Sequence, residues 1–132
     1  KDVKVFISQH NFLRIPPYPV LTTLVEDAKR VGASGVKIAA MSNAEGDSDH
    51  LYDFIQEFSK DFPYFSAFAM GNTGKPSRIL SLLKGANLSY GSILESSVPG
   101  QLSVRLMHEI LTKITEINDE TAIRQFLNQS LL

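Results

Sequence analysis

The chain has 132 residues, of which 43% are hydrophobic and 20% are charged, and its 13 basic and 14 acidic side chains give a net charge of −1. This is the composition of an ordinary globular domain with enough residues for a hydrophobic core. The balanced charge argues against nucleic-acid binding, and no apolar run approaches the ~18 residues that a membrane-spanning helix needs. The absence of cysteine excludes disulfides and thiolate metal sites, and it fits the cytoplasm, where we expect the protein to reside.

Short runs of β-branched and aromatic residues alternate with amphipathic segments along the chain. These runs predict four strands, over residues 3–8, 35–40, 65–70 and 88–91. Each strand is followed by a predicted helix, and a final helix begins near Asn118. Apolar residues at helical spacing predict the five helices: Leu21, Leu24, Val25 and Ala28; Leu51, Phe54, Ile55 and Phe58; Ile79, Leu82 and Leu83; Val104, Met107, Leu111 and Ile114; and Ile123, Phe126, Leu127 and Leu131.

Strands that alternate with amphipathic helices predict an α/β fold with a parallel sheet and right-handed crossovers. Four βα units suit either a small open doubly wound sheet or half of a (β/α)8 barrel, since a whole barrel takes ~250 residues. Periodicity alone leaves both architectures open. In each of them a functional site is expected at the carboxyl ends of the strands.

Lys37 is the most informative polar residue in the predicted strands. Its neighbours Val36 and Ile38 must face the helices, so strand alternation sends Lys37 to the opposite, enclosed side of the sheet. Burial favours the neutral amine, which is the form that attacks a carbonyl. The pattern is compatible with a catalytic lysine, and a lysine on an edge strand or in an ion pair is the alternative.

Ser8 and His10 close the first predicted strand, on the face opposite its apolar residues. His10 and Lys37 would end adjacent parallel strands and point the same way. A base beside a nucleophilic amine suits Schiff-base chemistry with proton removal next to a carbonyl. A histidine with a purely structural role is the alternative.

Further polar residues follow the third and fourth predicted strands. Gly71 and Gly74 are separated by two residues, so the run that precedes Pro76 does not fit a phosphate-binding loop. Arg78 lies in the first turn of the next helix, where it could hold an anion such as a carboxylate, with a surface arginine as the alternative. Ser97 and Gln101 follow the fourth strand. No metal site is predicted.

Four motifs resemble type I 3-dehydroquinate dehydratase, in that family's order and at compatible spacing. They are residues 7–12 (Ile-Ser-Gln-His-Asn-Phe), 36–39 (Val-Lys-Ile-Ala), 70–74 (Met-Gly-Asn-Thr-Gly) with Ser77 and Arg78, and 97–103 (Ser-Val-Pro-Gly-Gln-Leu-Ser). The resemblance covers residues 3 to about 115. It implies a (β/α)8 barrel lyase that dehydrates 3-dehydroquinate to 3-dehydroshikimate in the shikimate pathway of aromatic amino acid biosynthesis, without a metal or an organic cofactor.

The resemblance also implies a role for each matching residue. Lys37 would form an imine with the substrate ketone, and His10 would be the general acid and base. Arg78 would hold the substrate carboxylate, while Met70 would line the pocket. The substrate-binding residues that we expect are Ser8, Met70, Arg78, Ser97 and Gln101, the last two on a loop that closes over the substrate.

The chain departs from the family's pattern in three ways. Asn11 stands where the family often has aspartate, and Phe68 stands where it often has a second methionine. The match begins at the family's fifth strand, so the first four strands and their substrate-binding residues are missing. We therefore expect a fragment that needs another polypeptide, either the N-terminal half of the barrel or a further copy of itself, for efficient activity.

Two other functions stay open at this point. One is a non-catalytic α/β half-barrel that acts by association, and the other is a different Schiff-base lyase such as a class I aldolase. The expected organisation is a half-barrel over residues 1–115 and a terminal helix, over residues 116–132, that packs on it. The expected partner is a small-molecule substrate, with no nucleic acid and no membrane.

Overall fold

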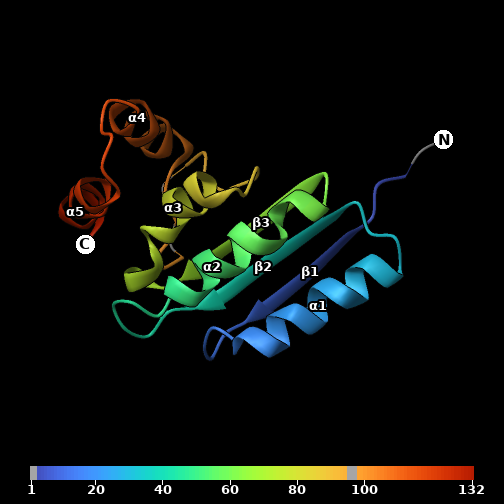
Figure 1. Ribbon diagram of the computed structural model, residues 1–132. Coiled ribbons are helices and arrows are strands. Elements are labelled where there is room, and N and C mark those ends of the chain that lie inside the picture. Colours follow the sequence, from blue (N-terminus) through green and yellow to red (C-terminus); the bar gives the residue numbers. More distant parts are fainter. Residues whose placement is uncertain (1–2, 95–97) are drawn as a thin grey trace.

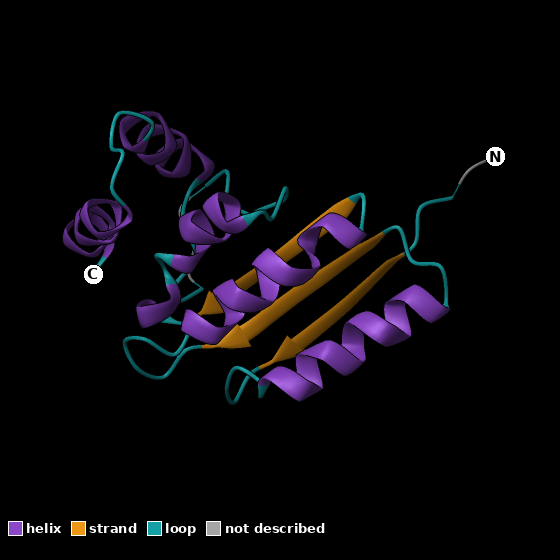
Figure 2. Ribbon diagram, viewed as in Figure 1, coloured by secondary structure: helices purple, strands orange, loops and turns teal. Residues whose placement is uncertain are grey.

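The computed structural model describes residues 3–94 and 98–132. Its centre is a three-stranded parallel sheet in the order β1 (Phe6–Asn11), β2 (Gly35–Met41) and β3 (Tyr64–Met70). Helices α1 (Tyr18–Arg30) and α2 (Asp49–Phe58) connect these strands and cover one face of the sheet (Figures 1 and 2). The parallel α/β fold predicted from the sequence is therefore confirmed.

The chain after β3 is mainly helical. The short helices η1 and η2 flank β3. Helices α3, α4 and α5 follow, and they lie towards the carboxyl ends of the strands and beyond them (Figure 1). None of the helices formed by the described residues is long and apolar enough to cross a membrane. The bounds are η1 (Ser59–Asp61), η2 (Asn72–Gly74), α3 (Ser77–Lys84), α4 (Val104–Ile114) and α5 (Glu120–Leu131).

The hydrophobic core lies between the sheet and its covering helices. Val36 and Ile38 of β2 point to this face and are almost completely buried, as are Leu21 and Val25 of α1. Phe54 of α2 lies at the centre, where its ring packs against the rings of neighbouring aromatic residues at centroid distances of 5.3–6.1 Å. The core therefore uses one face of the sheet and leaves the other face available for a site.

The first strand begins later than predicted. The sequence predicted residues 3–8, whereas β1 spans Phe6–Asn11 because pairing starts where Phe6 meets Gly35 of β2 and continues until Asn11 meets Ala40. Ser8 and His10 consequently lie inside the strand. The exposed fraction alternates along β1, so both residues share one face, as predicted.

The predicted fourth strand over residues 88–91 is wrong. The backbone N–H groups of Asn87 and Leu88 both donate to the carbonyl of Phe65, but the segment then leaves β3. The Asn87 side chain accepts the hydrogen bond from the Phe65 N–H, and the Arg78 guanidinium donates to the Tyr90 carbonyl. Side chains thus occupy backbone positions that strand pairing would use, and in the part of the chain that the structure describes the segment forms an isolated parallel bridge between Ser92 and Ser103 instead of a strand.

Replacing Phe54 by alanine tests the aromatic centre of the core. Phe54 is 0% exposed, so Phe54→Ala should lower the free energy of unfolding by about 3–5 kcal/mol, measured by urea titration. Phe12→Ala is the matched control because Phe12 is 70% exposed, and its effect should stay near 0.5 kcal/mol. Equal effects of the two variants would contradict this description of the core.

Candidate functional site

The face of the sheet opposite α1 and α2 carries a row of three polar residues. Ser8, Lys37 and Ser66 are Cα partners across β1, β2 and β3, so they lie level with one another. They alternate with the buried core residues and therefore point away from the covering helices. Since β2 is the central strand, Lys37 is not on a sheet edge, and within the described residues it forms no salt bridge.

The Lys37 amine rests on an aromatic ring. Its Nζ lies 4.1 Å from the centroid of the Tyr90 ring, and that ring packs against Phe68 at a centroid distance of 6.1 Å. Tyr90 comes from the segment after α3, so two separate parts of the chain meet over the sheet. A cation over an aromatic face is attracted by the ring's quadrupole, and this attraction favours the direction that the flexible side chain takes here.

Arg78 also packs against the ring of Phe68. Its guanidinium carbon is 4.1 Å from the centroid of the Phe68 ring, and its Nη1 donates a hydrogen bond of 3.2 Å to the Tyr90 carbonyl. The residue is 4% exposed, so the alternative of a surface arginine is wrong. Burial lowers the pKa of Arg78 to about 10, which leaves it charged at neutral pH, and its buried Nε has no partner among the described residues.

His10 lies on the same face as Lys37 but two residues further along β1, opposite Ala39. It is exposed, and its ring lies 6.1 Å from that of Phe12. Among the described residues it has no hydrogen-bond partner, so nothing there supports the alternative of a structural histidine held by such bonds. His10 and Lys37 therefore lie on the same face of adjacent strands, as predicted, and no hydrogen bond joins them.

Two motif loops meet at the carboxyl end of β3. Gly71 and Gly100 both have positive φ angles, and a Cβ atom at Gly100 would come within 2.2 Å of the Gly71 carbonyl oxygen. This backbone contact brings the loop that carries Gln101 next to Met70, the last residue of β3. Ser97 lies outside the described residues, so its predicted place in this loop stays a prediction.

The sequence reasoning missed two residues of this site. Tyr90 belongs to the segment predicted as a strand, and only its contact with Lys37 shows its importance. Ser66 is 0% exposed in a strand of apolar residues, and a single serine in such a strand gives no sequence pattern that predicts a site. Its place two residues before Phe68, on the same strand face, is the signal that could have identified it.

The described part of the chain contains no group of three or more metal-ligating side chains. The acidic run before α2 has a structural role, because the Asp47 carboxylate accepts hydrogen bonds from the backbone N–H groups of Asn43 and Ala44. These bonds stabilise the turn that follows β2. The site on the sheet is therefore organised by an amine, an imidazole and a guanidinium.

The described site combines a parallel α/β sheet, a lysine on the sheet face opposite α1 and α2, and a buried arginine whose guanidinium packs on Phe68 of the same face. The family model described as type I 3-dehydroquinase matches residues 1–118, and the chain belongs to this family. The 3-dehydroquinate dehydratase of Methanosarcina mazei is 32% identical over 113 residues, which are 84% of this chain and 47% of that protein. The chain thus spans about half the length of the curated relatives it matches.

Solved structures agree with this assignment. The 3-dehydroquinate dehydratase of Geobacillus kaustophilus shares the fold with a TM-score of 0.79 at 24% identity, over 89% of this chain and 46% of that one. The type I enzyme of Clostridium difficile, solved with covalently modified comenic acid, has a TM-score of 0.76 at 28% identity, over 86% and 46%. These neighbours are (β/α)8 barrels, so the chain corresponds to about half of a barrel.

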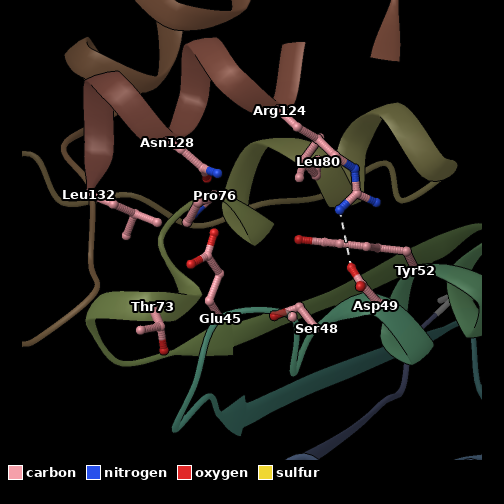
Figure 3. A pocket seen from close by; sticks show the side chains of 11 residues that line it. Glu45, Ser48, Asp49, Tyr52, Thr73, Pro76, Leu80, Arg124, Asn128 and Leu132 are labelled. Carbon is pink, nitrogen blue, oxygen red and sulfur yellow. Dashed lines mark hydrogen bonds and ion pairs between the residues drawn. The ribbon is translucent and has the colours of Figure 1, made fainter. Parts of the chain in front are cut away.

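A separate cavity of about 260 Å³ lies between α2, η2 and α5, away from the lysine. Figure 3 shows Arg124 of α5 reaching the Asp49 carboxylate, with Tyr52 beside them. The Arg124–Asp49 ion pair measures 3.1 Å, and the guanidinium carbon is 5.3 Å from the Tyr52 ring centroid. The family model matches residues 1–118, so helix α5, which forms one wall of this cavity, lies outside the matched part of the chain.

The Tyr52 phenol should make the chain less stable in alkali. Burial, the largest cause, raises the pKa of Tyr52 from 10.0 to about 12. The unfolded chain therefore loses this proton first, and the free energy of unfolding should fall as the pH rises from 10 towards 12. Tyr52→Phe should remove up to about 2 kcal/mol of this loss in urea titrations at pH 8 and pH 11.5. An unchanged alkaline loss in Tyr52→Phe would contradict the burial argument.

Proposed function

We propose that this chain carries the imine-forming half of a 3-dehydroquinate dehydratase, which converts 3-dehydroquinate to 3-dehydroshikimate in the shikimate pathway. The observation that carries the proposal is the position of Lys37 on the central strand, on the sheet face opposite α1 and α2, where its amine lies over Tyr90, the residue whose carbonyl accepts a hydrogen bond from Arg78. The chain's family membership supplies the substrate class. A cytoplasmic location belongs to the same proposal.

Lys37 is the proposed nucleophile. Its neutral amine attacks the ketone carbon of the substrate to form a carbinolamine, whose hydroxyl takes a proton from the general acid and leaves as water. The resulting iminium withdraws electrons from the neighbouring C–H bond and makes its proton easier to remove. The covalently modified comenic acid in the Clostridium difficile enzyme supports covalent chemistry within this family.

His10 is the proposed general acid and base. It takes the proton from the carbon next to the iminium carbon, and the electron pair left behind forms the enamine. The substrate hydroxyl on the following carbon then leaves as water with a proton from His10. Imidazole is the side chain best suited to take and return a proton near neutral pH.

The remaining residues would hold the substrate in place. Arg78 can donate two parallel hydrogen bonds to a carboxylate, and its unpartnered Nε supports such a role. Ser8 offers an exposed hydroxyl level with Lys37, and Met70 would line the pocket at the end of β3. Gln101 and Ser97 would close over the substrate from the loop that approaches Gly71.

Efficient turnover would need a second set of βα units. β1 is an edge strand, and its exposed residues on the site face include Phe6, Ser8 and His10. An open parallel edge invites pairing, and three strands cannot enclose a substrate. We infer that the complement is the other half of the barrel, on a second polypeptide segment, with a second copy of this chain as the alternative partner.

Borohydride trapping tests the proposed nucleophile. Incubation of the chain with 3-dehydroquinate and sodium borohydride should give a reduced adduct at Lys37, mapped by mass spectrometry after proteolysis. Lys37→Ala should lose the adduct, while Lys75→Ala, a lysine outside the sheet, should retain it. No adduct on the wild-type chain would favour a non-catalytic module, and an adduct at Lys75 alone would contradict the assignment.

Complementation tests the need for a second half. The chain alone should show little formation of 3-dehydroshikimate, measured by its ultraviolet absorbance. Addition of the N-terminal half of a full-length relative should raise the rate at least tenfold, because it would close the barrel around the substrate. Rapid turnover by the purified monomer would show that no complement is required.

A further inference from the structure

Ser66 has a buried hydroxyl group without a partner. The residue is 0% exposed, and its Oγ has no hydrogen-bond partner among the described residues. Buried hydroxyl groups are normally hydrogen-bonded, because an unpaired one loses its interactions with water. Because solvent does not reach this oxygen, a partner for it would come from the groups that surround it.

Lys37 is such a neighbouring group. Lys37 and Ser66 are Cα partners in the β2–β3 register, so their side chains leave the same face of adjacent strands. The Lys37 Nζ rests on the Tyr90 ring, but its flexible four-carbon stem allows it to turn towards the Ser66 Oγ. Ser8, on the other flank of Lys37, is exposed and can bond to water instead.

We propose that Ser66 is a positioning residue that accepts a hydrogen bond from the Lys37 amine during imine formation, an inference that rests on the proposed function. With one N–H held by the Ser66 Oγ, the nitrogen lone pair can point at the ketone carbon. The C–N bond forms, a proton moves from nitrogen to oxygen, and the resulting hydroxyl takes a further proton from the general acid His10 and leaves as water. The iminium keeps one N–H, which maintains the bond to Ser66.

The kinetics of trapping with cyanoborohydride test this role in the full chain. Ser66→Ala should lower the maximal rate of adduct formation at Lys37 about fivefold, the loss expected for one hydrogen bond. The half-saturating concentration of 3-dehydroquinate should not change, and Ser66→Thr should restore the rate. Ser81→Ala is the matched control, because the Ser81 hydroxyl is also buried and unpartnered among the described residues but lies on α3.

Thermal unfolding separates positioning from a structural role. Ser66→Ala should keep or raise the melting temperature, since the hydroxyl has no partner to lose. A lower melting temperature together with a rate that Ser66→Thr fails to restore would overturn the inference. Equal trapping by the wild-type chain and Ser66→Ala would overturn it while leaving the proposed function intact. A wild-type chain that forms no adduct would instead refute both.

Discussion

The pairing register of β2 between β1 and β3 determines most of what this chain can do. Because strand side chains alternate, one register sends Val36 and Ile38 into the core and Lys37 to the opposite face. A shift by one residue would exchange the two faces, exposing the apolar residues and burying the amine among helices. Burial of the core therefore also fixes the position of the lysine, and the site gains its geometry from the same interactions that stabilise the fold.

Aromatic rings organise the two cations of the site. The Lys37 amine lies on Tyr90 and the Arg78 guanidinium lies on Phe68, while the two rings contact each other. The Phe68 ring partly compensates for the loss of water around the buried arginine. Phe68, which replaces the methionine expected from the family resemblance, thus has a defined role as the surface on which Arg78 rests.

Strong periodic patterns made much of this structure predictable from the sequence. The alternation of apolar and polar residues around Lys37 identified its strand and the face of the sheet on which it lies. The helical spacing of apolar residues identified the helices. The failures lie where side chains replace backbone pairing. Asn87 and Arg78 bond to backbone groups that a fourth strand would have used, and no local pattern reveals this. Tyr90 was missed because its position depends on a contact with a distant segment, the Lys37 side chain of β2. Ser66 was missed because it is a single serine in an otherwise apolar strand.

The contact between Gly71 and Gly100 limits which amino acids can occupy these two positions. Two loops that are far apart in the sequence share a space that leaves no room for a Cβ atom. A side chain at Gly100 would collide with the Gly71 backbone, whereas a side chain at Gly71 would collide with Met41 and the Ser42 carbonyl at the end of β2. With their positive φ angles, both positions call for glycine wherever this loop arrangement is kept, even though neither residue has a side chain that could touch a substrate.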